Sequence, residues 1–302
     1  MRAITVRDRE AGIGSLALTE LPYPHAAEND VIVQVHAAGF TRGELDWPGT
    51  WTDRTGRDRT PTVPGHELSG VVVELGYGTT GLTVGQRVFG LADWLRDGSL
   101  AEYTAVEARN LAPLPSDIDH VDAAALVISG LTAWQALFDH AQLKPGQTVL
   151  IDGVGGAVGA IAVQLAHEAG AQVIGTGRAA DEDRAKELGV HKFVTVEELK
   201  GAGEVDVVLD VIGGEIRDSA TALVRPGGTL VTIADPPAVH PTNGRAIFFV
   251  VEPNRDQLIQ LAARLRDGSL KPLVNNIRTL AEAPEAFAPT LRGRTIIKVT
   301  ED

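Results

Sequence analysis

The chain of 302 residues contains no cysteine, so disulfides, thiolate nucleophiles and thiolate metal ligands are all excluded. Positive charge is also scarce, because 27 Lys and Arg stand against 40 Asp and Glu and give a formal net charge of -13. A surface of this charge repels nucleic-acid backbones and anionic lipid headgroups. We therefore expect neither nucleic acid nor a membrane as a partner.

Targeting signals are also lacking. Residues 1–8 are alternating and charged, without the apolar core of a secretory signal. We find no later apolar run that approaches the length of a bilayer span. The sequence thus predicts a cytoplasmic protein. With 44% hydrophobic residues, a chain of this length buries enough surface for two cores, so two domains are expected.

The pattern of residues changes twice along the chain. Residues 1–117 contain short β-branched runs between Gly and Pro, which predict a β-rich domain with a barrel-like or rolled sheet. Residues 118–247 alternate strands with helices, which predicts a doubly wound parallel sheet of the Rossmann type. The helical segment near 122–140 is one helix or two, because Gly130 interrupts it. Residues 248–302 add a helix and a terminal strand.

A glycine-rich turn follows the first strand of the alternating region. Residues 148–152 are a buried strand, residues 153–159 read GVGGAVG, and a helix follows. Glycines let the backbone approach a pyrophosphate, and a helix N-terminus offers free N–H groups. The spacing is not a literal G-x-G-x-x-G, so the strand and helix carry the prediction. The predicted cradle for a dinucleotide consists of Gly153, Gly155, Gly156, Ala157, Val158 and Gly159.

The end of the next strand predicts which dinucleotide binds. An acidic residue at this tip hydrogen-bonds the ribose of NAD, but here the strand ends at Gly177-Arg178. A guanidinium is suited to bidentate contact with the 2′-phosphate of NADP. The sequence therefore favours NADPH over NADH, with Arg178 as the main phosphate ligand and Arg184 as a second candidate.

Several motifs in order along the chain resemble one family. They are PGHELSGVV at 64–72, GSLAEY at 98–103, GLTAW at 130–134, the glycine turn, DVVLDVIGG at 206–214 and GRTIIKV at 293–299. The whole chain resembles the zinc-independent quinone oxidoreductase branch of the medium-chain dehydrogenase/reductase superfamily. The resemblance implies a GroES-like domain over residues 1–117, completed by residues 248–302, and a Rossmann NADPH-binding domain over residues 118–247, with substrate between them.

Zinc chemistry is not expected. Zinc-dependent relatives use two cysteines where this chain has Thr41 and Ser129. His66 and Glu67 supply at most two good ligands, fewer than the three protein ligands of a catalytic zinc. We expect them instead to make structural hydrogen bonds, although contact of His66 with substrate stays open.

Without a Lewis acid, conjugated acceptors are the easier substrates, since the negative charge formed by hydride addition is delocalised onto oxygen. The resemblance places Thr41 near the nicotinamide, where its hydroxyl is a candidate hydrogen-bond donor and the predicted catalytic residue. It also implies that the nicotinamide is lined by Thr132, Ile233, Ala234, Phe249 and Val250.

Alternatives remain open at this point. A quinone reductase is not separated from an enone or enal reductase of a biosynthetic pathway, nor from a non-catalytic NADPH-binding protein. Trp47, Trp51 and Trp94 either wall an aromatic pocket or anchor the fold. Relatives often form homodimers through a Rossmann sheet edge, and the strand at residues 246–251 is the candidate edge.

Overall fold

The computed structural model describes residues 1–288 and 293–300. They form two compact units. Unit 1 comprises residues 1–128, 253–266 and the described part of 274–302, and unit 2 comprises residues 129–252 and 267–273. The domain boundaries expected from the sequence, after residues 117 and 247, stay a prediction.

Unit 1 is built on a mainly antiparallel sheet of seven strands, ordered β14-β15-β3-β4-β5-β7 with β6 also paired to β3. Its strands are β3 (Asp30–Gly39), β4 (Glu67–Leu75), β5 (Arg87–Leu91), β6 (Tyr103–Glu107), β7 (Leu111–Pro113), β14 (Asn276–Thr279) and β15 (Thr295–Lys298). A separate hairpin pairs β1 (Arg2–Thr5) with β2 (Ala17–Glu20). The β-branched runs read from the sequence supply the buried faces of these strands.

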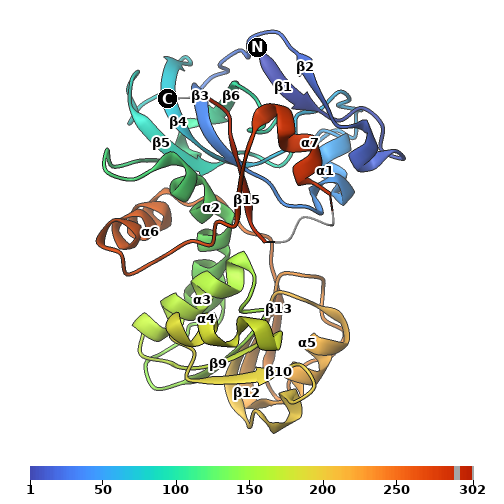
Figure 1. Ribbon diagram of the computed structural model, residues 1–302, viewed down its shortest axis with the longest axis vertical. Helices are drawn as coiled ribbons and strands as arrows, with labels where there is room; N and C mark the ends of the chain where they lie inside the picture. The colour runs from blue at the N-terminus through green and yellow to red at the C-terminus, as the bar shows by residue number, and fades with distance from the viewer. Residues whose placement is uncertain (289–292, 301–302) are drawn as a thin grey trace. The chain divides into compact units, whose positions relative to one another are not determined.

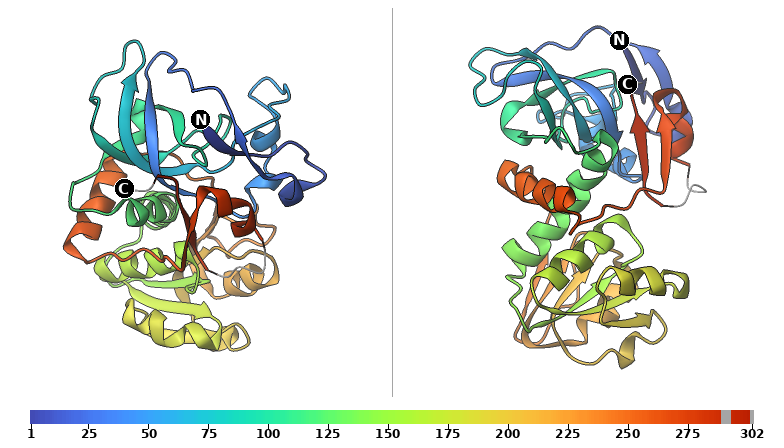
Figure 2. Two further views of the ribbon diagram at one scale, coloured as in Figure 1. Left: turned by 45° about the horizontal axis from the view of Figure 1, so that its top comes forward. Right: turned by 60° about the vertical axis from the view of Figure 1, so that its left-hand side comes forward.

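The C-terminal strand joins the N-terminal sheet. β15 runs antiparallel to β3, with Ile296 opposite Gly39, and the red C-terminal segment lies against the blue strands in both views of Figure 2. The short helices of unit 1 are η1 (Gly12–Ser15), η2 (Glu44–Asp46), α1 (Pro48–Trp51), η3 (Ala108–Asn110), η7 (Leu280–Glu282) and α7 (Ala283–Ala286), and α6 (Arg255–Asp267) is longer.

Unit 2 contains a six-stranded sheet in the order β10-β9-β8-β11-β12-β13, and every strand pair in it is parallel. The strands are β8 (Thr148–Asp152), β9 (Gln172–Gly177), β10 (Lys192–Thr195), β11 (Val205–Asp210), β12 (Val224–Thr232) and β13 (Arg245–Phe248). The helices are α3 (Ala157–Glu168), α4 (Glu182–Glu187) and α5 (Gly214–Thr221), with short turns η5 (Ala179–Asp181) and η6 (Leu199–Gly201) (Figure 1).

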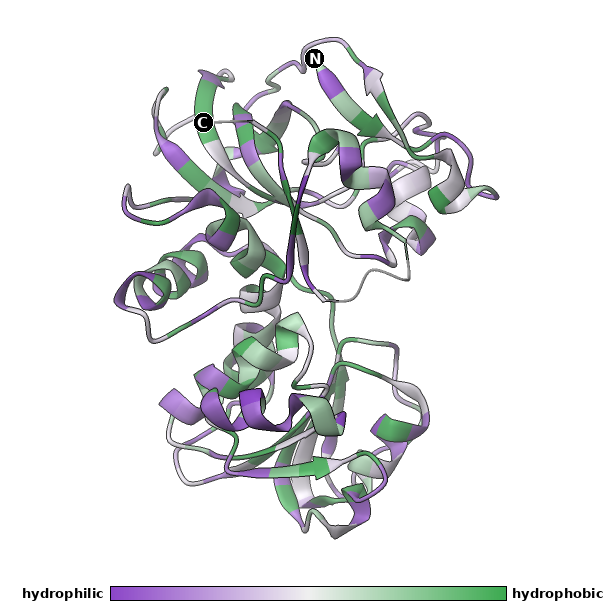
Figure 3. Ribbon diagram, viewed as in Figure 1, coloured by the Kyte–Doolittle hydropathy of each residue, from purple (hydrophilic) through white to green (hydrophobic). Residues whose placement is uncertain are grey.

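The expected fold class is confirmed, because strands and helices alternate around a parallel sheet in unit 2. Figure 3 shows why these segments form a buried sheet covered by helices: the strands are largely hydrophobic, while α4 is hydrophilic. One strand is irregular. β12 already pairs Val224 with Val205, and its register shifts before Thr229 pairs with Val207.

Helix α2 (His120–Trp134) continues through Gly130 and then as a π-helical segment, η4 (Gln135–His140). It is therefore one helical segment and not two. The expectation that no apolar run approaches the length of a bilayer span was wrong, because residues 120–140 have the length and hydropathy of a span. In this structure 72% of the apolar window is buried inside the protein.

Candidate dinucleotide site

The glycine turn joins β8 to α3 in a conformation that needs glycine. Gly153 has a φ of 82°, in the left-handed region. The N–H groups of Gly153 and Val154 both donate to the Thr176 carbonyl, at 3.1 and 3.0 Å, which fixes the turn to β9. A Cβ on Gly159 would lie 2.2 Å from the Gly153 carbonyl oxygen. The helix therefore packs on the turn only because residue 159 has no side chain.

The first turn of α3 presents free amides. Gly156 is the N-cap residue and makes no side-chain capping bond. The N–H groups of Ala157, Val158 and Gly159 follow it, and an α-helix leaves its first N–H groups without intrahelical acceptors. These amides and the partial positive charge of the helix N-terminus form a site for an anion. The residues predicted to hold the pyrophosphate therefore fit that group.

The loop after β9 carries the predicted phosphate ligands. Gly177 is the last residue of β9, and Arg178 follows it with an exposed side chain. Arg184 donates a hydrogen bond to the Gly155 carbonyl at 3.0 Å, so it lies beside the cradle. Asp181 lies 3.6 Å from Arg184 and was not among the predicted site residues.

The residues predicted to line the nicotinamide all belong to unit 2, but they differ in burial. Ile233 and Ala234 directly follow the C-terminal end of β12, and Thr132 is buried in α2. Phe249 is buried, with its ring centroid 4.4 Å from that of His140, whereas Val250 is 62% exposed. Their contact with a cofactor stays a prediction.

Four polar residues form a row across the carboxyl ends of adjacent strands in unit 2. Asp152 lies opposite Thr176, Asp210 lies opposite Thr232, and all four are fully buried. The threonine hydroxyls donate to Asp152 Oδ1 at 2.9 Å and to Asp210 Oδ2 at 2.6 Å. Burial, helped by the nearby Asp210 charge, raises the pKa of Asp152 to about 7.

This row of four residues was not predicted from the sequence. A carboxylate at the end of each of two buried strands, as in LID at 150–152 and VLD at 208–210, is the signal that was available. Asp210 also accepts hydrogen bonds from the N–H groups of Ile212 and Gly213, at 3.0 and 2.8 Å, and so holds the loop after β11.

In unit 1, Thr41 lies next to a buried carboxylate that the sequence did not single out. Glu44 is fully buried and accepts hydrogen bonds from the N–H groups of Gly65, at 2.7 Å, and of Thr41, at 3.2 Å. His66 Nδ1 lies 3.5 Å from Glu44 Oε2. Glu44 therefore holds the backbone at Thr41 and leaves the threonine hydroxyl out of these contacts.

His66 and Glu67 differ in their bonding. His66 is buried, and its Nδ1 makes no hydrogen bond within the described residues. Its nearest acidic neighbour is Glu44, whose Oε2 lies 3.5 Å from Nδ1, and the expected hydrogen bonding of His66 stays a prediction. Glu67 does make such bonds, since it pairs with Arg294 and accepts the Ile128 N–H at 3.0 Å.

Three aromatic rings of unit 1 pack together. Trp47 and Trp94 meet edge to face with centroids 5.0 Å apart, and the His66 ring lies 4.8 Å from Trp94. Trp51 is buried and its indole N–H donates to the Leu45 carbonyl at 2.7 Å. Trp51 thus anchors the fold, while Trp47 and Trp94 are half-buried around His66.

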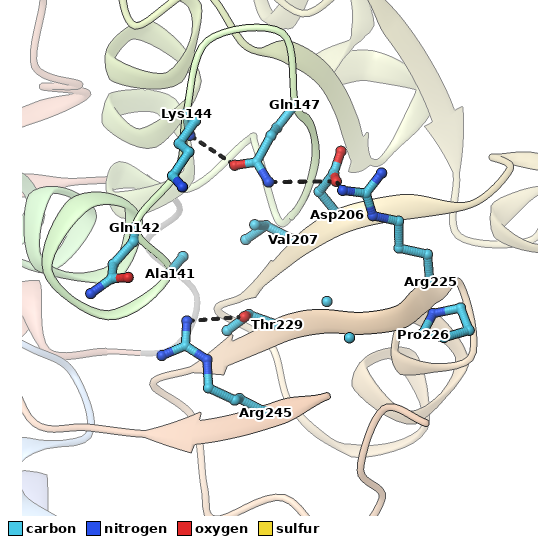
Figure 4. Close-up of a pocket in the computed structure, with 12 residues that line it drawn as sticks. Ala141, Gln142, Lys144, Gln147, Asp206, Val207, Arg225, Pro226, Thr229 and Arg245 are labelled. Atoms are coloured by element: carbon cyan, nitrogen blue, oxygen red, sulfur yellow. Dashed lines mark hydrogen bonds and ion pairs between the residues drawn. The ribbon is translucent and has the colours of Figure 1, made fainter. Parts of the chain in front are cut away.

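A polar pocket lies at the opposite, amino-terminal edge of the unit 2 sheet (Figure 4). Lys144, Arg225 and Arg245 border it, and Arg225 pairs with Asp206. Arg245 donates to the Thr229 hydroxyl at 3.2 Å. The parallel strands begin here, so the pocket is distinct from the glycine turn at their carboxyl ends.

Comparison with known proteins identifies the family. Residues 27–116 match the alcohol dehydrogenase GroES-like domain, and residues 157–251 match the zinc-binding dehydrogenase family. The 2-methylene-furan-3-one reductase of Solanum lycopersicum is 33% identical over 295 residues, covering 91% of this chain and 72% of that protein. The solved quinone oxidoreductase of Coxiella burnetii is 25% identical, with a TM-score of 0.89 over 99% of both chains. The chain belongs to the quinone oxidoreductase branch of the medium-chain dehydrogenase/reductase superfamily.

As a medium-chain reductase, the chain is an oxidoreductase. It also matches part of much longer proteins. The spectinabilin polyketide synthase system protein NorB of Streptomyces orinoci is 34% identical over 255 residues, which are 78% of this chain and 12% of that protein. One family match is named for zinc, yet within the part of the chain that the structure describes, no three His, Cys, Asp or Glu side chains are grouped to hold a metal.

Proposed function

We propose that this medium-chain reductase transfers hydride from NADPH to a quinone or another conjugated carbonyl compound, without zinc. The glycine turn is the observation that carries the proposal. Gly159 lets α3 pack directly on the Gly153 carbonyl, and the first amides of α3 stay open to an anion. This geometry supports a bound pyrophosphate.

NADPH is the proposed dinucleotide because two guanidinium groups lie at the relevant loop. Arg178 follows the tip of β9, and Arg184 is fixed beside Gly155. A 2′-phosphate bound there would meet both charges. When bound, the reduced nicotinamide supplies the hydride, and Thr132, Ile233, Ala234, Phe249 and Val250 are the proposed lining of its ring.

Thr41 is the proposed donor to the substrate oxygen. Its main-chain N–H is held by Glu44, so the residue is fixed while its hydroxyl remains available. A hydroxyl aimed at the oxygen stabilises the negative charge that forms there. This arrangement suits an acceptor in which the charge is delocalised, and it needs no metal ligand at Thr41 or Ser129.

An enone reductase is the second candidate, and the relatives favour keeping it. The reductase of Solanum lycopersicum acts on a 2-methylene-furan-3-one, and the alkenal/one oxidoreductase of Arabidopsis thaliana, 32% identical over 281 residues, is named as NADPH-dependent. Both names describe carbonyl compounds with a conjugated alkene. The family is enzymatic, which argues against a non-catalytic NADPH-binding protein.

A substrate panel tests the proposal. Purified protein is mixed with NADPH and with a series of quinones, enones, enals and unconjugated ketones, and cofactor oxidation is followed by absorbance. We expect turnover of conjugated acceptors and none of unconjugated ketones, unchanged by a chelator. Turnover of plain ketones that a chelator abolishes would contradict the proposal.

The remaining expectations belong to the same proposal. We propose a cytoplasmic homodimer without nucleic-acid or membrane partners. The net charge of -13 supports the absence of nucleic acid. β13 forms one edge of the unit 2 sheet and ends at the exposed Phe248, which supports pairing of two copies at this edge.

A further inference from the structure

The carboxylate of Asp181 lies directly against the glycine turn. A Cβ on Gly155 would lie 2.5 Å from Asp181 Oδ2 and 2.6 Å from its Cγ. A Cβ on Gly177, the tip of β9, would lie 3.5 Å from the same oxygen. One carboxylate therefore touches both the cradle for the pyrophosphate and the strand tip that selects the adenosine ribose.

Contacts within the loop hold Asp181 in this place. Its Oδ2 accepts the Arg178 main-chain N–H at 3.3 Å, and its Oδ1 lies 3.6 Å from Arg184 Nη2. The same Arg184 nitrogen donates to the Gly155 carbonyl at 3.0 Å. Asp181 therefore interacts with Arg184, which is one of the two arginines that could bind a 2′-phosphate.

The charges of this loop oppose each other. Arg178 and Arg184 attract a phosphate, whereas the Asp181 carboxylate repels it and is 27% exposed, so water screens the repulsion only in part. A ribose 2′-hydroxyl behaves in the opposite way, because it can donate a hydrogen bond to a carboxylate. The Glu182 carboxylate should repel a phosphate less than Asp181 does, since it pairs with Lys186 at 2.6 Å.

We propose that Asp181 is the residue that sets the cofactor preference of this site. It accepts the ribose 2′-hydroxyl of NADH and repels the 2′-phosphate of NADPH, so that the chain binds both dinucleotides and its preference for NADPH is small. The proposal rests on the proposed function in one respect, namely that a nicotinamide dinucleotide binds at the glycine turn.

The test is calorimetric binding of NADPH and of NADH to the full chain, without an acceptor. Asp181→Asn removes the charge but keeps an oxygen for the Arg178 N–H. We expect about tenfold tighter NADPH binding, the change that corresponds to losing one nearby like charge, and NADH binding that is unchanged or weaker. Asp183→Asn is the matched control, because Asp183 is an exposed acid two residues further on, in the first turn of α4.

The outcomes separate the two proposals. Equal changes for both dinucleotides in Asp181→Asn would show a structural role in the loop and overturn the assignment. An equal gain in Asp183→Asn would show a general effect of net charge and also overturn it. If neither dinucleotide binds the wild-type chain, the proposed function itself fails. Tighter NADPH binding confined to Asp181→Asn, in a variant with wild-type circular dichroism, supports the assignment.

Discussion

Glu67 and Arg294 form an ion pair that is almost closed to water, since Glu67 is fully buried and the Arg294 side chain is 10% exposed. The residues are 227 positions apart and join β4 to the segment that leads into β15. Burial raises the pKa of Glu67, and the Arg294 charge opposes that rise. The pair thus connects the N-terminal and C-terminal segments that make up unit 1.

Removing one partner of this pair is expected to be costly. Arg294→Gln leaves a buried carboxylate without its cation and should lower the free energy of unfolding by about 3 kcal/mol. The loss should grow with pH, because a group with a raised pKa in the folded state loses stability as it ionises. Urea denaturation at two pH values measures both effects. The double variant Glu67→Gln/Arg294→Gln should recover most of the loss, and no recovery would contradict this account.

Asp152 should also make the free energy of unfolding depend on pH. Its pKa of about 7 in the folded protein exceeds the value of 3.8 for a free side chain, so its contribution to stability falls as pH rises through 7. Between pH 5.5 and 8 the wild type should lose about 2 kcal/mol relative to Asp152→Asn, which keeps the acceptor for Thr176. Parallel denaturation curves over this range would contradict the prediction.

Gly159→Ala tests the close packing of the turn. The added methyl meets the Gly153 carbonyl, so the protein should lose about 2 kcal/mol of stability. NADPH binding, measured by calorimetry, should weaken about tenfold or more as the turn opens. Gly201→Ala is the control, since a Cβ there meets nothing within 4 Å. Unchanged binding in Gly159→Ala would remove the turn from the cofactor site.

Thr41→Val tests the donor to the substrate oxygen. It removes the hydroxyl at nearly constant volume, and kcat/KM for a conjugated acceptor should fall about a hundredfold, as for the loss of one oxyanion donor. NADPH affinity should stay constant, and Thr41→Ser should retain most of the activity. Wild-type turnover in Thr41→Val would show that another group carries this role.

The sheet edge at β13 predicts the oligomeric state. Phe248 is 39% exposed at the end of this edge strand, so Phe248→Asp should convert the expected homodimer to a monomer, as measured by light scattering. Val239→Asp, at a position that is 42% exposed outside any strand, should leave the dimer intact. A wild-type monomer would refute the proposed assembly.

The sequence predicted the elements of unit 2 well, because strands of buried β-branched residues alternate there with helices and the turn needs glycine at fixed positions. It did not predict the row of Asp152 and Asp210 with their threonines. Which residues of different strands lie side by side depends on strand order and register, and the chain order of the strands does not give these. The sequence also missed Asp181, since its contact with Gly155 depends on how one short loop folds back.

Unit 1 shows the same limit. The motif containing His66 and Glu67 was recognisable, but the neighbouring Glu44 and the ion-pair partner Arg294 come from other segments of the chain. Whether the segment around α2 forms one helix or two was left open, because Gly130 interrupts it. Its neighbours in the folded protein bury most of its surface, and a helix surrounded in this way tolerates an internal glycine.

The contact between Gly159 and the Gly153 carbonyl has a consequence for how this protein can diverge. Position 159 has no room for a side chain, so under the proposed function a substitution there disturbs cofactor binding as a whole. The loop from Arg178 to Arg184 is half exposed and carries opposed charges, so single substitutions can shift the balance between the two dinucleotides. Under the proposed function, the position of the dinucleotide depends on the glycine turn and the choice between NADPH and NADH depends on the loop, so a substitution in the loop can change the preferred cofactor while the hydride donor stays in place.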